Sequence, residues 1–350
     1  MSSPSSLAVL RWFDRHGRKS LPWQHAKNPY RVWISEIMLQ QTQVATVIGY
    51  YQNFMVRFPD VQTLAAAPLD EVLALWAGLG YYSRARNLHA AAKYVVAHFA
   101  GAFPKTVAEM IELPGIGRST AGAILSLGSD LRAPILDGNV KRVLCRVAGI
   151  SLHEDVRRNE QRLWQLADEL TPTTRVADYN QAMMDIGATV CTRGMPNCAM
   201  CPFNLSCVAR AEQNFSAYPG SKPAKVLPEK STRMLVLLNC RDEVLLQQRP
   251  PSGIWGGLWV LPEVPELLSP GEFAEQFGNA TGLRALLPLR HTFSHFHLDI
   301  HTFAGVMRGN GSRIMDSPWR WQPMTNLKAV GLPAPIQRLL TQIASESKSI

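Results

Sequence analysis

The sequence predicts two domains, an all-helical one followed by an α+β one, and three observations support this prediction. From Ser6 to about Arg210, apolar residues recur at helical spacing with little alternation of period two. A proline-rich stretch without periodicity follows, which is typical of an extended linker. Beyond it, Met234–Leu238 and Val244–Gln248 have the composition of strands on either side of a polar turn. We expect a helical domain over residues 1–211, a linker over 212–230 and an α+β domain over 231–350.

Length and charge limit the functional class. The 350 residues are 46% hydrophobic, which is enough for two buried cores. Lys and Arg number 36 against 27 Asp and Glu, and the net charge of +9 favours a polyanionic partner such as nucleic acid. Arg11, Asp14 and Arg15 interrupt the first apolar residues, and no later apolar run is long enough to cross a membrane. We therefore expect a soluble, cytoplasmic monomer without a membrane partner.

Four of the six cysteines lie within one short segment. They are Cys191, Cys198, Cys201 and Cys207. Four thiolates at this density can converge on one inorganic centre, and both an iron–sulphur cluster and a zinc ion accept such a ligand set. Free structural cysteines are the remaining alternative. Cys145 and Cys240 stand apart, a pattern that fits a reducing compartment better than a disulfide framework.

The segment Leu113–Gly117 predicts a tight turn between two helices. Backbone N–H groups at Gly115 and Gly117, together with the N-terminus of a helix that follows from Ser119, can hold a DNA phosphate without sequence preference. A plain turn between helices explains the glycines equally well. Basic residues nearby are further phosphate candidates, or else solvated surface charges; they are Arg84, Arg86, Lys141 and Arg142.

Two carboxylates are candidates for catalysis. Tyr30–Gln41 predicts a helix in which Glu36 lies at the edge of the apolar stripe. Burial there raises the pKa of a carboxyl and keeps it protonated, as a general acid requires, whereas a surface glutamate is the simpler alternative. Asp137 precedes an apolar-periodic segment and is expected to cap its helix. Such a cap is rigid and ionised, and it can also stabilise a cationic intermediate.

These motifs resemble those of the MutY-type adenine DNA glycosylases in the endonuclease III superfamily. The similar strings are the cysteine spacing, the hairpin extended to Gly122, Trp33–Thr42 and Asp137–Val143, and the resemblance covers nearly all of residues 7–350. It implies a helix-hairpin-helix glycosylase domain with the hairpin at about 109–126, a 4Fe-4S cluster held by the loop 191–207, and a Nudix-like second domain. It also implies a bacterial protein that associates with DNA.

The resemblance further implies a mechanism. Adenine mispaired with 8-oxoguanine or guanine in duplex DNA is the implied substrate, and an abasic site is the product. Glu36 protonates the adenine at N7, Asp137 stabilises the cationic sugar and Asn139 helps to orient that carboxylate. A lysine stands where this chain has Ser119 in the superfamily members with strong lyase activity, and it forms a Schiff base with the sugar. We therefore expect base release with little strand cleavage.

Residues for base recognition are also implied by the resemblance. Gln41 and Tyr81 match the wedge that enters the base stack, with Leu39 nearby. The adenine pocket corresponds to Trp23, Gln24 and Gln181, although Trp23 is equally well explained as a core residue. The second domain recognises the oxidised guanine through Phe293, Ser294 and His295.

The second domain leaves alternatives open. His291, His295, His297, His301 and Asp299 share one parity, so that in a strand they would form a polar face or, less simply, a zinc site.

A Nudix-type nucleotide hydrolase is the rival function, but its magnesium site is incomplete. Counted from Gly257, Glu263, Glu272 and Glu275 fit the Nudix box, whereas Gly271 and Gln276 replace an arginine and a glutamate. A DNA damage sensor without catalysis is the third possibility, and the linker could dock repair or replication proteins.

Overall fold

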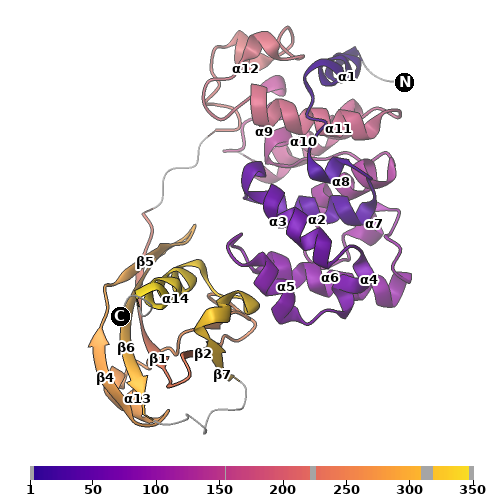
Figure 1. Cartoon of the computed structure of the whole chain (residues 1–350). Coiled ribbons are helices and arrows are strands. Elements are labelled where there is room, and N and C mark those ends of the chain that lie inside the picture. Colours follow the sequence, from indigo (N-terminus) through magenta and orange to yellow (C-terminus); the bar gives the residue numbers. More distant parts are fainter. Residues whose placement is uncertain (1–3, 154, 221–225, 309–317, 347–350) are drawn as a thin grey trace. The chain divides into compact units, whose positions relative to one another are not determined.

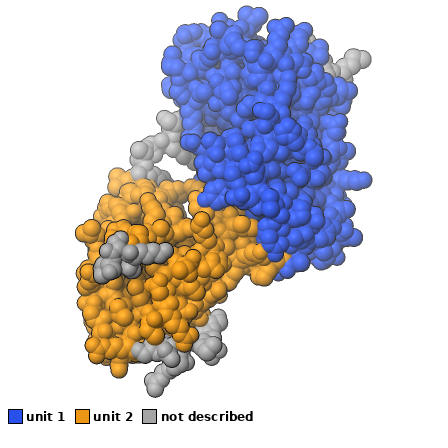
Figure 2. Space-filling model, in the orientation of Figure 1, with its two compact units in different colours: residues 1–66, 87–224 blue, residues 67–86, 225–350 orange. Residues whose placement is uncertain are grey.

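The computed structural model describes residues 4–153, 155–220, 226–308 and 318–346. The chain forms two compact units (Figure 2). Unit 1 comprises residues 1–66 and 87–224, and unit 2 comprises residues 67–86 and 225–350. The segment 67–86 therefore groups with the C-terminal residues, although the expected helical domain surrounds it in the sequence. None of the described helices is both long and apolar enough to cross a membrane.

Unit 1 consists of helices, as the apolar spacing predicts (Figure 1). They are α1 (Pro4–His16), η1 (Pro22–Gln24), α2 (Pro29–Leu39), α3 (Val44–Arg57), α4 (Val61–Ala66), α6 (Ser83–Phe99, which begins in unit 2), α7 (Val107–Met110), α8 (Arg118–Ser129), α9 (Gly138–Ala148), α10 (Val156–Leu170), α11 (Val176–Asp185), η2 (Ile186–Val190), η3 (Cys198–Met200) and α12 (Val208–Ala211).

Helix α2 lies in the middle of this unit and packs against α3 and α8. Trp33, Ile34 and Met38 of this helix are completely buried. Helix α8 can approach α2 closely because Gly128 lies against the backbone of Pro29, where a Cβ atom would come within 2.7 Å of the Cα atom. Helix α11 packs on both α1 and α8. The position of α2 is therefore fixed by burial along most of its length.

In its described residues, unit 2 contains a seven-stranded sheet, helices and one segment from earlier in the chain. Its elements are α5 (Leu69–Trp76), β1 (Glu229–Leu238), β2 (Glu243–Gln248), β3 (Trp259–Val260), α13 (Pro270–Glu275), β4 (Ala280–Ala285), β5 (Leu289–Thr292), β6 (His297–Met307), β7 (Trp319–Pro323), η4 (Met324–Ala329) and α14 (Ala334–Glu346).

The sheet order is β3-β2-β1-β6-β4, with β5 also paired to β6 and β7 to β2. Strands β1 and β6 run parallel over ten residue pairs, from Glu229↔His297 to Leu238↔Val306, whereas the other pairs are antiparallel. Leu235, Leu237 and Leu245 project from β1 and β2 into a core with Phe273 and Phe277 of the α13 region. The predicted strands 234–238 and 244–248 are confirmed, and β1 begins five residues earlier than predicted.

The histidines of equal sequence parity do not all lie on one face of the sheet. A turn at residues 293–296 separates β5 from β6, and His291 pairs with Leu298 across the two strands. Directly opposite residues in an antiparallel pair point to the same face. His291 thus lies on the face of Leu298, opposite to His297, and the expectation of one histidine face is wrong. Among the described residues, no group of three or more His, Cys, Asp or Glu is arranged to hold a single metal ion.

Part of the expected linker packs on unit 1. Arg146 Nε donates to the carbonyl oxygen of Tyr218 at 3.2 Å, and Leu152 N donates to that of Pro219 at 3.0 Å. Residues 221–225 of the expected linker lie outside the described residues. The described segment 212–220 is therefore attached to the helices rather than extended.

Candidate active site

Glu36 and Asp137 face one pocket of about 590 Å³ in unit 1. Glu36 projects from α2, whose other residues are mostly buried, and Asp137 caps the N-terminus of α9. Most of the other residues of unit 1 that the sequence singled out for catalysis and base recognition line the same space. They are Trp23, Leu39, Gln41, Ser119, Asn139 and Gln181. Residues separated by more than a hundred positions thus converge on the two carboxylates.

Burial, and after it the neighbouring charge of Asp137, together raise the pKa of Glu36 to about 8. The side chain keeps an intermediate solvent exposure because it borders an open pocket, while protein atoms surround it densely enough to remove most of its hydration. Within the described part of the chain, no hydrogen-bond donor contacts its carboxyl group. The protonated form of Glu36 is therefore favoured at neutral pH.

Asp137 is held by several donors. Val140 N donates to its Oδ1 atom at 2.8 Å, which confirms the predicted N-cap, and Asn139 Nδ2 donates to Oδ2 at 3.3 Å. Burial raises the pKa of Asp137, whereas these hydrogen bonds and the charge of Arg142 oppose that rise. Glu36 lacks such donors, so nothing comparable opposes the rise of its pKa and its protonated form is favoured.

Arg142 connects this carboxylate to the cysteine loop. Its Nη2 atom donates to Asn139 Oδ1 at 3.0 Å and to the carbonyl oxygen of Gly187 at 2.5 Å, and its Nε atom donates to the carbonyl oxygen of Cys191 at 2.8 Å. Gly187 lies so close to Asn139 that a Cβ atom would come within 2.6 Å of it. The expectation of a phosphate contact or solvated charge at Arg142 does not fit this buried position.

A second network lies behind the pocket and was not predicted from the sequence. Asp185 is completely buried and accepts from the backbone N of Arg18 at 2.8 Å and from its Nε atom at 2.7 Å. Gln181 Nε2 donates to the same carboxylate at 2.9 Å. Arg18 and Asp185 are 167 residues apart in the sequence, and no local motif identifies the pair. Their ion pair fixes the amide of Gln181 at the pocket wall.

Two of the other predicted residues line the pocket, Ser119 and Trp23, whereas Gln24 does not. Ser119 Oγ accepts from Leu136 N at 3.0 Å. Trp23 is 6% exposed and meets Tyr51 edge to face at 5.5 Å, so it is a core residue as well as part of the pocket wall. Gln24 does not line the pocket, because its amide closes the turn before η1: it accepts from Leu21 N and donates to the carbonyl oxygen of Arg18.

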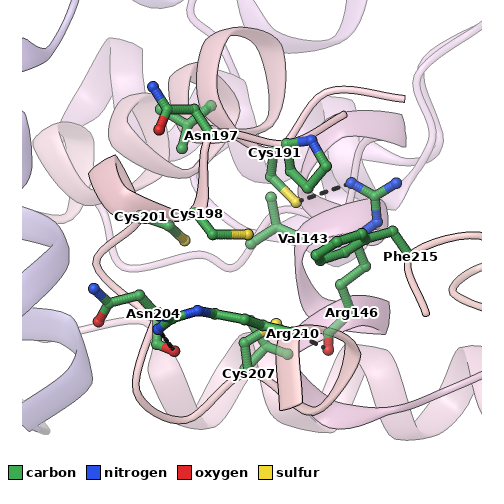
Figure 3. A pocket seen from close by; sticks show the side chains of 13 residues that line it. Val143, Arg146, Cys191, Asn197, Cys198, Cys201, Asn204, Cys207, Arg210 and Phe215 are labelled. Carbon is green, nitrogen blue, oxygen red and sulfur yellow. Dashed lines mark hydrogen bonds between the residues drawn. The ribbon is translucent and has the colours of Figure 1, made fainter. Parts of the chain in front are cut away.

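The four clustered cysteines surround a separate pocket in unit 1 (Figure 3). Cys191, Cys198, Cys201 and Cys207 line it together with apolar and basic side chains. Arg146 Nη1 approaches Cys191 Sγ at 3.4 Å, and Arg210 also borders the space. A site of four thiols beside cationic groups suits a ligand set that carries negative charge. The donor set thus fits an iron–sulphur cluster.

The predicted hairpin has the backbone that a phosphate contact requires. Gly115 adopts a left-handed φ of +77°, and Gly117 is the N-cap of α8. Both glycines are exposed. The basic candidates outside the hairpin are engaged elsewhere: Arg84 is buried, and Lys141 Nζ pairs with Glu160 Oε1 at 2.6 Å.

The residues predicted to form the wedge and to read the opposite base lie on turns or loops. Gln41 in unit 1 and Tyr81 in unit 2 both have left-handed φ values, +56° and +48°. Backbone strain of this kind persists where the surrounding structure imposes it and is frequent at binding sites. Phe293, Ser294 and His295 form the turn between β5 and β6, in which Ser294 and His295 are exposed.

Two of the three Nudix-box carboxylates have structural partners. Glu263 accepts from Thr232 Oγ1 at 2.6 Å and pairs with Arg249. Glu272 forms a capping box with Ser269 at the start of α13. Carboxylates committed in this way are poor ligands for magnesium. The geometry therefore does not favour a nucleotide hydrolase.

Comparisons with known proteins agree with this arrangement. Residues 34–169 match the HhH-GPD superfamily of base excision DNA repair proteins, and residues 233–342 match the NUDIX domain. An adenine DNA glycosylase of Buchnera aphidicola is 39% identical and covers 96% of this chain and 95% of its own length. The human adenine DNA glycosylase is 36% identical over 86% of this chain and 67% of its own.

Among solved structures, a thermostable thymine-DNA glycosylase superimposes with a TM-score of 0.54 at 28% identity and covers 59% of this chain and 95% of its own. The fold prediction, helical glycosylase domain followed by Nudix domain, is confirmed. The chain belongs to the adenine DNA glycosylases, enzymes of base excision repair.

Proposed function

We propose that this enzyme hydrolyses the N-glycosidic bond of adenine mispaired with 8-oxoguanine or guanine in duplex DNA and leaves an abasic site without cutting the strand. The observation that carries the proposal is the pair of carboxyls, Glu36 and Asp137, which border one pocket with unequal hydrogen bonding. Environments that differ in this way assign one carboxyl as the acid and the other as the base or electrostatic partner.

Glu36 acts as the general acid. Its raised pKa keeps a proton available near neutral pH, and transfer of that proton to N7 of the flipped adenine makes the base a better leaving group. Glu36 recovers a proton later in the turnover, when water adds to the sugar and gives up a proton at the pocket. General acid catalysis of this kind contributes a factor of about 10² to 10⁴.

Asp137 stabilises the positive charge that develops on the sugar when the bond breaks. The hydrogen bonds from Val140 N and the Asn139 amide hold its carboxylate in one orientation, so little reorganisation is needed during the reaction. Water then adds to the sugar carbon, and its proton passes to a carboxylate at the pocket. Ser119 borders this space but has no amine for a Schiff base, which supports base release without lyase activity.

Cys191, Cys198, Cys201 and Cys207 would ligate a 4Fe-4S cluster. The four thiols around one pocket support this assignment, as does the adjacency of Arg146 and Arg210 to a group of net negative charge. A bound cluster would serve here as a structural centre that orders the loop 191–207. The Arg142 hydrogen bonds then extend that order to Asn139 and so to the catalytic aspartate.

Selection of the mispair is assigned to Gln41, Tyr81 and the turn Phe293–His295. Adenine itself is undamaged, and its extrusion costs a few kcal/mol, so discrimination has to come from the opposite base. Exposed polar and aromatic groups on strained or tight turns support contacts with an opened base stack. The hairpin glycines Gly115 and Gly117 would hold a backbone phosphate.

A comparison of two variants in single-turnover excision tests the proposal. Glu36→Gln should bind the mispaired duplex with near-normal affinity. It should release adenine at least a hundredfold more slowly, because a general acid contributes a factor of about 10² to 10⁴ to the rate. Glu160→Gln is the matched control, because Glu160 is a helix carboxylate that pairs with Lys141 away from the pocket. Substantial excision by Glu36→Gln would remove Glu36 from the role of the acid.

A further inference from the structure

The turn predicted to recognise the oxidised base is supported by a tryptophan that the proposed function does not use. Trp255 is 6% exposed and lies in the loop 249–258 between β2 and β3. Its ring centroid is 5.8 Å from that of Phe293 and 5.9 Å from that of His291. Phe293 in turn stacks on Phe296 at 4.5 Å with an interplanar angle of 23°. Trp255 therefore packs beneath one end of the 293–296 turn.

The loop that carries Trp255 is rigidly closed. Arg249 N donates to the carbonyl oxygen of Leu258 at 2.8 Å, and Leu258 N donates to that of Trp255 at 2.9 Å. Trp255 itself has a left-handed φ of +54°, which a non-glycine residue adopts only when its surroundings impose it. A Cβ atom at Gly256 would come within 2.5 Å of the carbonyl oxygen of Pro251. The backbone of the loop thus defines where the side chain of Trp255 begins, and its contacts with Phe293 and His291 hold the ring.

Both ends of this loop are attached to the segment 67–86. Gln248 and Trp259 face each other across β2 and β3 at the base of the loop, and each donates to Asp70: Gln248 Nε2 to Oδ1 at 3.0 Å and Trp259 Nε1 to Oδ2 at 3.2 Å. At the tip, Arg86 Nη1 donates to the carbonyl oxygen of Gly256 at 2.6 Å. One carboxylate and one guanidinium therefore hold the loop at its base and tip.

The same segment presents Tyr81. This residue is 43% exposed, and the guanidinium of Arg84 lies 5.6 Å from its ring centroid. Leu73 of α5 also packs against the C-terminal part of unit 2, since Cβ atoms built at Gly257 and Gly331 would lie 3.4 Å and 3.1 Å from it. Tyr81 and the 293–296 turn are thus carried by parts of unit 2 that are joined through the loop 249–258.

We propose that Trp255 is a positioning residue for recognition of the opposite base, and that Asp70 and Arg86 lock its loop so that Tyr81 and the 293–296 turn act as one body. The inference rests on the proposed roles of Tyr81 and Phe293–His295. It predicts that Trp255 contributes to the preference for 8-oxoguanine over guanine although it has little exposed surface with which to contact DNA.

The test uses two duplexes, one with adenine opposite 8-oxoguanine and one with adenine opposite guanine. For each duplex, the single-turnover rate constant of adenine excision is divided by the dissociation constant, and the value for 8-oxoguanine is then divided by the value for guanine. Trp255→Leu removes both aromatic contacts and should lower the ratio of the two values by about tenfold. Trp255→Phe keeps a ring in place and should retain the ratio within about threefold. Asp70→Asn can accept only one of the two hydrogen bonds at the loop base and should reduce the ratio in the same direction.

Phe277→Leu is the matched control. Phe277 is 7% exposed in the same unit and also has two aromatic neighbours, Phe273 at 5.1 Å and Trp319 at 4.8 Å, but it lies in the core beside α13. It should lower the thermal stability of the unit and leave the ratio unchanged. An equal loss of the ratio in this control, or an unchanged ratio in Trp255→Leu, would overturn the inference. If the unaltered enzyme does not distinguish the two duplexes, the recognition role of the 293–296 turn fails and this inference with it. If the unaltered enzyme releases adenine from neither duplex, the proposed function itself fails.

Discussion

Glu36→Gln should make the protein more stable while it removes activity, and the size of the gain follows from the site. The pKa of Glu36 is about 8 in the folded chain against an ordinary value of 4.5. The folded chain therefore binds more protons than the unfolded chain, so that stability falls as the pH rises from about 4.5 to about 8. By pH 7 this loss amounts to about 3 kcal/mol, and we reduce it to about 2 kcal/mol because one side of the pocket is open to water.

The assay is urea or thermal unfolding of the intact protein and of the variant at pH 5 and pH 7. Glutamine is neutral at both values, and so the gain should be about 2 kcal/mol at pH 7 and only a few tenths of a kcal/mol at pH 5. At pH 7 the midpoint of thermal unfolding should rise by several degrees. Glu160→Gln, which loses an exposed ion pair, should show no such dependence on pH. Equal stability of Glu36→Gln and the parent at both pH values would refute the buried-acid reasoning.

Three further predictions concern the same site. Excision should fall about tenfold between pH 7 and pH 9, because Glu36 loses its proton near pH 8, and single-turnover rates across this range measure it. A lysine at position 142 cannot bridge Asn139 and Cys191 at once, so Arg142→Lys should slow excision by about tenfold without loss of iron. Single-turnover rates and metal analysis of the same preparation measure the two quantities. Asp185→Asn leaves a partly buried arginine uncompensated and should cost about 3 kcal/mol in urea unfolding; a loss below 1 kcal/mol would contradict the assigned network.

Local features were predictable from the sequence. The helical spacing predicted the helices of unit 1, and an aspartate before an apolar-periodic segment predicted the N-cap at Asp137. The glycines of the hairpin predicted a tight turn, and Gly115 adopts a left-handed φ there. Each of these features depends on residues within one or two turns of the chain, which is the range over which sequence patterns carry structural information.

Long-range contacts were not predictable. The ion pair of Arg18 and Asp185 joins distant segments, and each residue alone has the pattern of a surface charge. The packing of segment 67–86 on the C-terminal sheet depends on Asp70, which in the sequence is an ordinary acidic residue in the first turn of a helix. The histidine parity failed because a four-residue turn interrupts the strand, so that the pleat on either side of it belongs to two different strands.

The most direct test of the central claim is adenine release from duplexes with one adenine opposite 8-oxoguanine, guanine or thymine, with strand breaks assayed before and after hot alkali. The account predicts breaks that require alkali at adenine opposite 8-oxoguanine and guanine, few breaks opposite thymine, and little trapping of the enzyme by borohydride. Breaks without alkali in high yield, or equal release opposite thymine, would contradict it.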